Sequence, residues 1–172
     1  MSVSEISAAH DAPHAGALDA SGLAALVRQV AADADRWCGL VRFDARERYY
    51  TRLYGDSSVD VWLLTWLSGQ LTELHDHGDS TAAFTIVRGT LREVRADRRG
   101  RLSRLRLSAG QTQVITPGVA HDVHHAGRRP AVSIHAYSPP LTSMTFYRRL
   151  RGGGLVPVRT VRGSHPEFEE SP

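Results

Sequence analysis

The sequence has a single cysteine, Cys38, and no lysine. One cysteine excludes an internal disulfide framework and a zinc site built from several cysteines. No apolar run approaches the roughly 20 residues that span a bilayer, and the first 20 residues lack the charged start and apolar stretch of a signal peptide. We therefore predict a cytoplasmic protein that is not bound to a membrane, with Cys38 as a small buried residue.

All 21 basic side chains are arginines, against 18 acidic ones, so the formal net charge is +3. Eight arginines gather around one predicted hairpin with a turn at 96–101: Arg88, Arg92, Arg95, Arg98, Arg99, Arg101, Arg104 and Arg106. Aromatic residues do not interleave with them, and no nucleic-acid-binding motif accompanies them. We predict that these arginines face solvent and that nucleic acid is not a partner.

The length of 172 residues fits one domain. Residues 1–19 mix Ala, Ser, Pro and His without periodicity, which indicates a flexible leader. Apolar residues on one helical face, after a capping Ser21, predict a helix over 21–38 on the outside of the fold: Leu23, Leu26, Val27 and Val30. This helix is expected to belong to a single domain over 20–150. Residues 151–172 are then a C-terminal extension with a candidate edge strand, LVPVRTV, and a mobile tail.

After residue 50 the sequence changes to short β-rich runs separated by Gly, Asp and Ser. The predicted strands are 59–67, 72–77, 83–88, 90–96, 102–107, 112–116, 120–125, 131–137 and 143–149. Short strands at this spacing are typical of an antiparallel sandwich or barrel. We therefore predict an all-β fold with an N-terminal helical annex.

Two histidines flank an aspartate at 75–77. Side chains two apart on a strand share a face, so His75 and His77 project together while Asp76 points away. Two imidazoles on one side of a rigid strand can present two nitrogens to one metal ion. The H-x-H pattern alone is a weak signal, because it also occurs without a metal.

Glycines frame this pair and a third histidine. Gly69 precedes His75 in a G-x5-H-D-H pattern, and Gly110 opens a G-x5-T-P-G-x2-H pattern that ends at His121. The two motifs together resemble the cupin superfamily of small antiparallel double-stranded β-barrels. The resemblance implies a metal held by His75, His77 and His121.

The sequence departs from the cupin motifs at two positions. Ala82 stands where the first motif usually carries a glutamate ligand, and His125 stands where the second usually ends in asparagine. The expected site therefore has three neutral imidazoles and no carboxylate. Zn, Fe, Ni, Cu and Mn all accept such ligands, so the ligands alone leave the metal open.

Four stretches narrow the resemblance: YTRLYGD at 50–56, HDHGDS at 75–80, RGTLREV at 88–94 and AVSIHAYSPPL at 131–141. In this order they are similar to the cysteine dioxygenase family, and the similarity covers roughly residues 45 to 150. The implied cofactor is Fe(II). Animal members can join their active-site tyrosine to a cysteine, but the matching residue here is Ala82. The sequence is therefore closer to bacterial members, and Tyr137 is expected to be unmodified.

Tyr50 and Arg52 share a face if their segment is extended. A planar guanidinium suits bidentate binding of a carboxylate, although a surface arginine is the simpler interpretation of this residue alone. The resemblance matches Arg52 to the family's carboxylate-binding arginine, so we expect Arg52, assisted by Tyr50, to bind substrate.

Ser133, His135 and Tyr137 alternate with apolar residues on one predicted strand. A Ser-His-Tyr row inside a barrel can orient the phenol, or it can simply satisfy polar groups in a core. The resemblance assigns these three residues to catalysis, with Tyr137 reaching the substrate and oxygen site. His135, His124 and His125 are not expected to bind the metal.

The implied reaction is the oxidation of L-cysteine by O2 to cysteine sulfinic acid, a step of cysteine catabolism. Cysteine would chelate Fe(II) through its thiolate and amine, and O2 would take the remaining position. A small thiol and O2 are then the partners of a monomeric enzyme. Two alternatives stay open. One is another thiol such as 3-mercaptopropionate, whose relatives tend to carry glutamine in place of Arg52, and the other is a non-oxidative metal-binding sensor or binding module.

Overall fold

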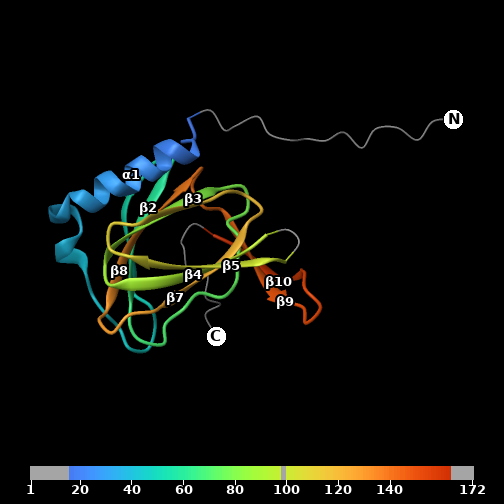
Figure 1. Ribbon diagram of the computed structural model, residues 1–172. Coiled ribbons are helices and arrows are strands. Elements are labelled where there is room, and N and C mark those ends of the chain that lie inside the picture. The colour runs from blue at the N-terminus through green and yellow to red at the C-terminus, as the bar shows by residue number, and fades with distance from the viewer. Residues whose placement is uncertain (1–15, 98–99, 164–172) are drawn as a thin grey trace.

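A computed structural model describes residues 16–97 and 100–163 (Figure 1). The predicted leader therefore lies largely outside the described residues, as do the end of the predicted tail, Arg98 and Arg99. One α-helix, α1 (Ala20–Ala32), precedes two short 3-10 turns, Ala34–Arg36 and Cys38–Leu40. Ten strands follow: β1 (Tyr50–Gly55), β2 (Asp60–Trp66), β3 (Thr81–Arg88), β4 (Thr90–Ala96), β5 (Leu102–Ser108), β6 (Thr112–Ile115), β7 (Ala120–His125), β8 (Ala131–Ser138), β9 (Ser143–Arg149) and β10 (Leu155–Arg162).

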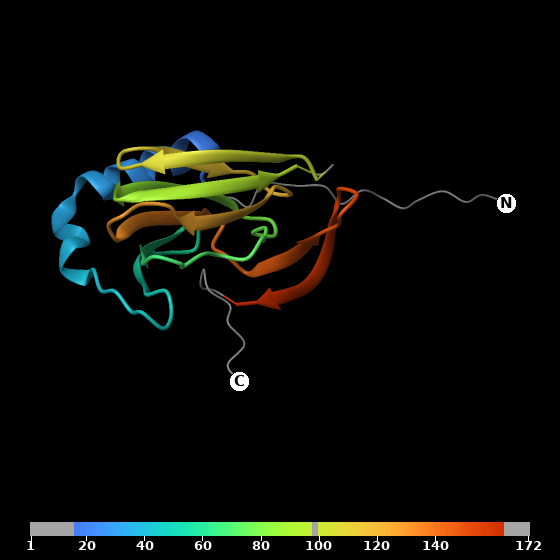
Figure 2. The same cartoon turned by 60° about the horizontal axis from the view of Figure 1, so that its bottom comes forward.

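The strands form antiparallel sheets that enclose a core without closing into a continuous ring. One sheet has the order β1-β2-β8-β3-β6, and a second has the order β5-β4-β7. The pair β9-β10 forms a third, small sheet beside them (Figure 2). The all-β prediction is confirmed, and the candidate strand LVPVRTV forms most of β10.

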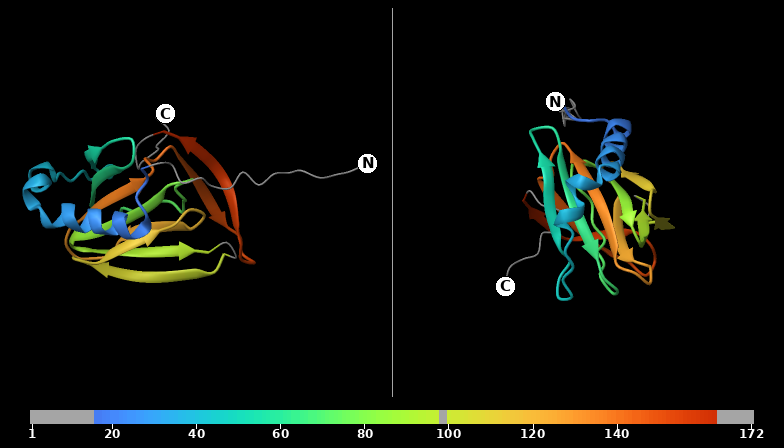
Figure 3. Two further views of the ribbon diagram at one scale, coloured as in Figure 1. Left: turned by 90° about the horizontal axis from the view of Figure 1, so that it is seen from above. Right: turned by 90° about the vertical axis from the view of Figure 1, so that its left-hand side faces the viewer.

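The five-stranded sheet is covered on both faces. Trp62, Leu64 and Trp66 of β2 pack into the interior between the sheets, whereas Val61 packs against α1 on the other side. All residues of β2 and β8 are buried, as expected for strands without a solvent face. The helix lies along the outer side of these strands, as the sequence predicted (Figure 3).

The helix begins and ends at other residues than predicted. Its N-cap is Asp19, whose side chain accepts a hydrogen bond from the Gly22 amide at 2.7 Å, and Ser21 is not the cap. The buried residues of the helix end at Val30, and between Ala32 and Leu40 only Trp37 packs, partly buried, against the same cluster, so the chain lacks a continuous apolar face to extend the helix. Cys38 is exposed in the second 3-10 turn, and its predicted burial is therefore wrong.

One strand prediction fails, at the histidines. Residues 72–77 form isolated bridges instead of a continuous strand, whereas β1 is a full strand that the sequence predicted only as a conditional extended segment. The arginine hairpin is mostly exposed as predicted, except for Arg95, whose side chain is 23% exposed and faces Glu93 in the interior. Within residues 16–97 and 100–163, no helix is both long and apolar enough to cross a membrane.

Candidate metal centre

His75, His77 and His121 converge in the interior. The centroids of their rings are 4.8 to 5.0 Å apart, and one ring nitrogen from each lies within 4.8 Å of the others. All three residues are buried. The structure therefore brings together the three residues that the sequence singled out for a metal.

The backbone fixes the separation of two of these histidines. The His75 amide donates to the His121 carbonyl at 2.9 Å, and the His121 amide donates to the His75 carbonyl at 2.8 Å. His121 lies on β7, whereas His75 and His77 lie in the irregular segment after Leu71. A reciprocal bridge thus ties this segment to the three-stranded sheet and replaces the strand that the sequence predicted.

Asp76 holds the segment from the other side. Its Oδ1 accepts hydrogen bonds from the Gly78 amide at 3.1 Å and the Thr145 amide at 3.2 Å, and its Oδ2 accepts one from the Tyr147 hydroxyl at 2.6 Å. Burial, followed by this carboxylate, raises the pKa of Tyr147 to about 12, so the phenol remains a donor at neutral pH. Asp76 therefore supports the loop that carries both histidines.

The hydrogen bonds of two rings determine which nitrogen is free. His75 Nδ1 lies 2.7 Å from the Glu73 carbonyl, and His121 Nδ1 lies 2.9 Å from Glu93 Oε1. A carbonyl and a carboxylate only accept, so both Nδ1 atoms carry the proton. Both Nε2 atoms then present lone pairs, which is the arrangement of metal-binding imidazoles.

Burial keeps His75 and His77 neutral. It lowers the pKa of His75 to about 3, with a further contribution from His121. Burial, followed by the neighbouring histidines, also holds the pKa of His77 well below its usual value. The donor set therefore fits a cation, because His75 and His77 have no proton to lose from the binding nitrogen at neutral pH.

Glu93 is the supporting residue that the sequence analysis missed. It is fully buried, and its Oε1 contacts both His121 Nδ1 and Arg95 Nε at 2.9 Å. Burial opposes the charged form, but His121 and then Arg95 outweigh it and lower the pKa of Glu93. The signal was present in the alternation of β4, where Glu93 shares the inward face with Leu91.

The predicted Ser-His-Tyr row lies on β8. Trp66 Nε1 donates to Ser133 Oγ at 2.9 Å, and Ser133 Oγ lies 2.8 Å from His135 Nε2. Phe84 stacks on the His135 ring at 4.9 Å, which fixes its plane. The ring of Tyr137 lies 5.2 Å from that of His77, so this end of the row adjoins the histidine cluster.

The predicted substrate residues lie on β1. Tyr50 and Arg52 pair with Leu64 and Trp62, which face the interior, and the Tyr50 ring lies 6.0 Å from that of Trp62. The Arg52 side chain is 50% exposed and pairs with Asp60, whose side chain is only 2% exposed. Arg52 is thus on the interior face but at its open end, and Asp60 is a partner that the sequence analysis did not identify.

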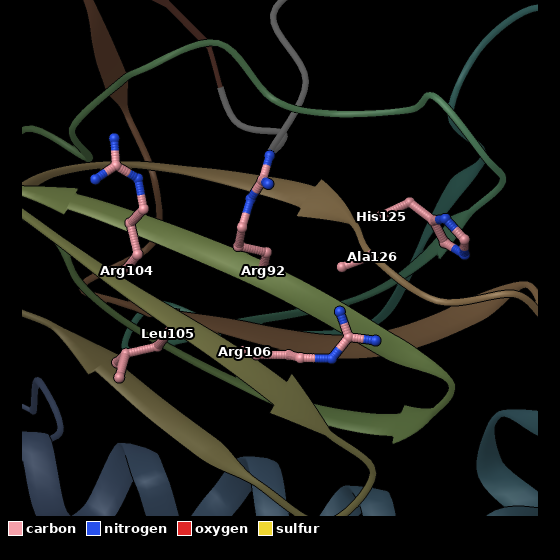
Figure 4. Close-up of a pocket in the computed structure, with 6 residues that line it drawn as sticks. All are labelled: Arg92, Arg104, Leu105, Arg106, His125 and Ala126. Atoms are coloured by element: carbon pink, nitrogen blue, oxygen red, sulfur yellow. The ribbon is translucent and has the colours of Figure 1, made fainter.

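Ala82, His124 and His125 contribute no side chain to the histidine cluster. Ala82 is buried directly across from Tyr137, so no carboxylate enters the cluster from this position. His124 bonds Asp122 at 2.7 Å, and His125 Nε2 bonds the Arg129 carbonyl at 2.9 Å. Figure 4 shows His125 and arginines of β4 and β5 that line a surface pocket, whose volume is about 350 Å³. Neither histidine joins the cluster, as predicted.

The metal-free protein is expected to lose stability as the pH falls below about 6.5. Unfolded histidines take up protons near that pH, whereas His75, His77 and buried His135 do so only at much lower pH in the folded state. The unfolded state therefore binds more protons in acid. Each such histidine lowers the free energy of unfolding by about 1.4 kcal/mol for every pH unit below 6.5. Urea unfolding at pH 7 and pH 5 measures the loss, and equal free energies of unfolding would contradict it. A His77→Gln variant should show a shallower dependence.

Glu93→Gln is expected to weaken the binding of a divalent metal by about 10- to 100-fold, because the variant loses the charged acceptor of His121 Nδ1. Competition with a chelator measures this affinity. Glu47→Gln is the matched control, since Glu47 is exposed and contacts Gln70 through its backbone carbonyl, which the substitution leaves in place. Equal affinity of Glu93→Gln and the unmodified protein would show that Glu93 does not support the site.

Comparison with known proteins agrees with this geometry. The family model "Cysteine dioxygenase type I" matches residues 3–150. Cysteine dioxygenase type 1 of Rattus norvegicus is 27% identical over 127 residues, which cover 67% of this chain and 63% of the relative. That of Danio rerio is 31% identical over 126 residues, which cover 66% and 62%. The chain thus spans less than two thirds of these curated relatives.

A solved structure shows the fold. A double-stranded β-helix protein of Klebsiella pneumoniae superposes with a TM-score of 0.50 at 20% identity, covering 59% of this chain and 80% of that one. This likeness confirms the predicted cupin architecture, in which two antiparallel sheets enclose the site. The family match, over residues 3–150, includes the helical annex, the three histidines and all of β9. The chain belongs to the cysteine dioxygenase type I family.

Proposed function

We propose that the protein is an Fe(II)-dependent thiol dioxygenase that converts L-cysteine and O2 to cysteine sulfinic acid. Family membership supports an oxygenase of this type. The observation that carries the proposal is the convergence of three buried imidazoles beside Tyr137 and on the same interior surface as Arg52. A purely structural metal site would need neither the phenol nor the guanidinium.

The metal would be held by His75, His77 and His121. Because Ala82 supplies no carboxylate, the ligands leave the charge of the ion uncompensated, which favours an anionic thiolate as its next ligand. When bound, Fe(II) would supply a Lewis acid for the thiol and a redox centre for O2. Glu93 would hold His121 in the tautomer that this requires.

Arg52 would bind the substrate carboxylate. Its Nη2 is engaged by Asp60, and the guanidinium keeps other N–H donors for a carboxylate at the open end of the site. This contact would orient cysteine with its thiol and amine toward the histidines. Tyr50 lies two residues away on the same face and would limit the movement of the substrate.

Tyr137 would hydrogen-bond the carboxylate or the reacting oxygen. It is buried, so a proton on its hydroxyl stays within the site. Burial, followed by His121, holds the pKa of His135 well below its usual value, so His135 stays neutral and orients neighbours without supplying a proton. Trp62 and Phe84 line the interior and exclude water, and the Trp62 Nε1 is a buried donor without a partner in residues 16–97 and 100–163.

We further propose that residues 20–150 form the catalytic domain of a cytoplasmic monomer whose partners are a small thiol and O2. The cupin core, the annex α1 and all proposed site residues lie within these limits. Residues 151–172 would be an extension whose described part adds β10 to β9.

O2 consumption by the Fe(II)-loaded protein with L-cysteine tests the proposal. His121→Ala should lower iron binding and O2 uptake by more than about 100-fold, because a ligand is worth more than a supporting residue. His124→Ala should leave both unchanged, because His124 contacts Asp122 and Arg92 outside the cluster. An indispensable His124 with a dispensable His121 would contradict the ligand assignment. A protein that binds Fe(II) but takes up no O2 with any thiol would instead be a binding or sensor module.

Turnover of L-cysteine and 3-mercaptopropionate under equal conditions tests the substrate. We expect a higher kcat/KM for L-cysteine, since both its amine and its thiolate can reach the metal while Arg52 holds the carboxylate. Arg52→Gln should lower kcat/KM for L-cysteine by about 10- to 100-fold, the value of charge-assisted hydrogen bonds to a carboxylate. A preference for 3-mercaptopropionate in the unmodified enzyme would overturn the choice of cysteine.

A further inference from the structure

An irregularity in β1 places two residues side by side on the interior face. Arg52 pairs with Trp62, but the next pair is Tyr54 with Val61, so Leu53 is an extra residue in β1. Trp62 faces the interior and Val61 faces α1, which means that Arg52 points inward and Tyr54 points outward. The strand returns to the interior face at the following residue, Gly55, which pairs with Asp60.

Gly55 provides the space that the Arg52 side chain occupies. A Cβ atom at Gly55 would lie 1.8 Å from Arg52 Nη2, 2.3 Å from Arg52 Cζ and 2.4 Å from Asp60 Oδ1. The backbone of Gly55 is not in the left-handed region, so its φ angle does not require glycine. The requirement is therefore steric: any side chain at Gly55 would displace the guanidinium, the carboxylate, or both.

Asp60 fixes one edge of the same guanidinium. The carboxylate is almost fully buried, and its Oδ1 accepts a hydrogen bond from Arg52 Nη2. A buried carboxylate without a partner would be strongly unfavourable, so the two side chains are held together. Within the part of the chain that the structure describes, no other side chain bonds to Arg52. Asp60 therefore fixes the orientation of the guanidinium, while the other N–H groups of Arg52 can still donate hydrogen bonds to a substrate carboxylate.

We propose that Gly55 and Asp60 are positioning residues that seat the Arg52 guanidinium and thereby set the preference of the site for thiols that carry a carboxylate. The inference rests on the proposed function in that the ligand is a thiol bound at the histidine cluster. It extends that function by naming two residues that touch neither the metal nor the substrate. Gly55 leaves space for the Arg52 guanidinium, and the Asp60 carboxylate attracts and orients this guanidinium.

The test measures thiol binding without turnover. Protein loaded with Co(II) is titrated in the absence of O2 with L-cysteine and with cysteamine, which has the same thiol and amine but no carboxylate. The thiolate-to-metal absorption band reports each Kd. Gly55→Ala should raise the Kd of L-cysteine by about 10- to 100-fold, because the contact with its carboxylate is lost. The Kd of cysteamine, which has no carboxylate, should change by less than about twofold. Gly39→Ala is the matched control, since a Cβ there meets nothing within 4 Å.

Asp60→Asn provides a second variant that keeps the size of the side chain and one acceptor oxygen. It should also weaken the binding of L-cysteine but not that of cysteamine. In a protein that already carries Arg52→Ala, Gly55→Ala should not change the ratio of the two Kd values any further. Equal weakening of both thiols, or of neither, would overturn the inference, as would tighter L-cysteine binding by Asp60→Asn. Failure of the unmodified protein to bind any thiol would overturn it as well. If the protein binds L-cysteine selectively but consumes no O2, the dioxygenase proposal would be refuted, whereas the positioning role of Gly55 and Asp60 would be supported.

Discussion

The site depends on holding three imidazoles close together inside a small β fold and on keeping His75 and His77 neutral. Burial supplies the neutrality, because it lowers the pKa of His75 and His77. The rings of His75 and His121 are oriented by hydrogen bonds from their Nδ1 atoms to the Glu73 carbonyl and the Glu93 carboxylate, respectively. The reciprocal backbone bridge between His75 and His121 then joins two segments that are far apart in sequence. Proximity, tautomer and charge state are thus set by different parts of the chain.

The five-stranded sheet arranges the rest of the site in two adjacent rows across its inner face. One row contains Arg52, Trp62, His135 and Phe84, and the next contains Gly55, Asp60, Tyr137 and Ala82. In the second row the two polar side chains lie between two of the smallest residues. Glycine and alanine at its ends leave room for the guanidinium on one side and for the phenol on the other. The shape of the site is therefore set as much by absent side chains as by present ones.

The sequence predicted those features that depend on local spacing. His75 and His77 are two residues apart, and the alternation of β8 put Ser133, His135 and Tyr137 on one face without knowledge of the neighbouring strands. Other features require the register of distant strands. The sequence alone cannot pair Arg52 with Asp60, because a single extra residue in β1 decides which side chains face inward. The end of α1 at Ala32 also depends on tertiary packing, since the buried face of the helix against the sheet ends at Val30.

Support for the cluster also extends beyond the residues that match the family. Arg159 of β10 lies over the Phe146 ring at 3.9 Å and forms an ion pair with Glu73 at 2.5 Å. Phe146 packs against His75 at 5.9 Å, and the Glu73 carbonyl is the acceptor of His75 Nδ1. One arginine thus contacts both neighbours that orient this imidazole. Because the family match ends at residue 150, this contact is a feature of the extension and not of the matched core. The extension therefore packs against the residues that surround His75.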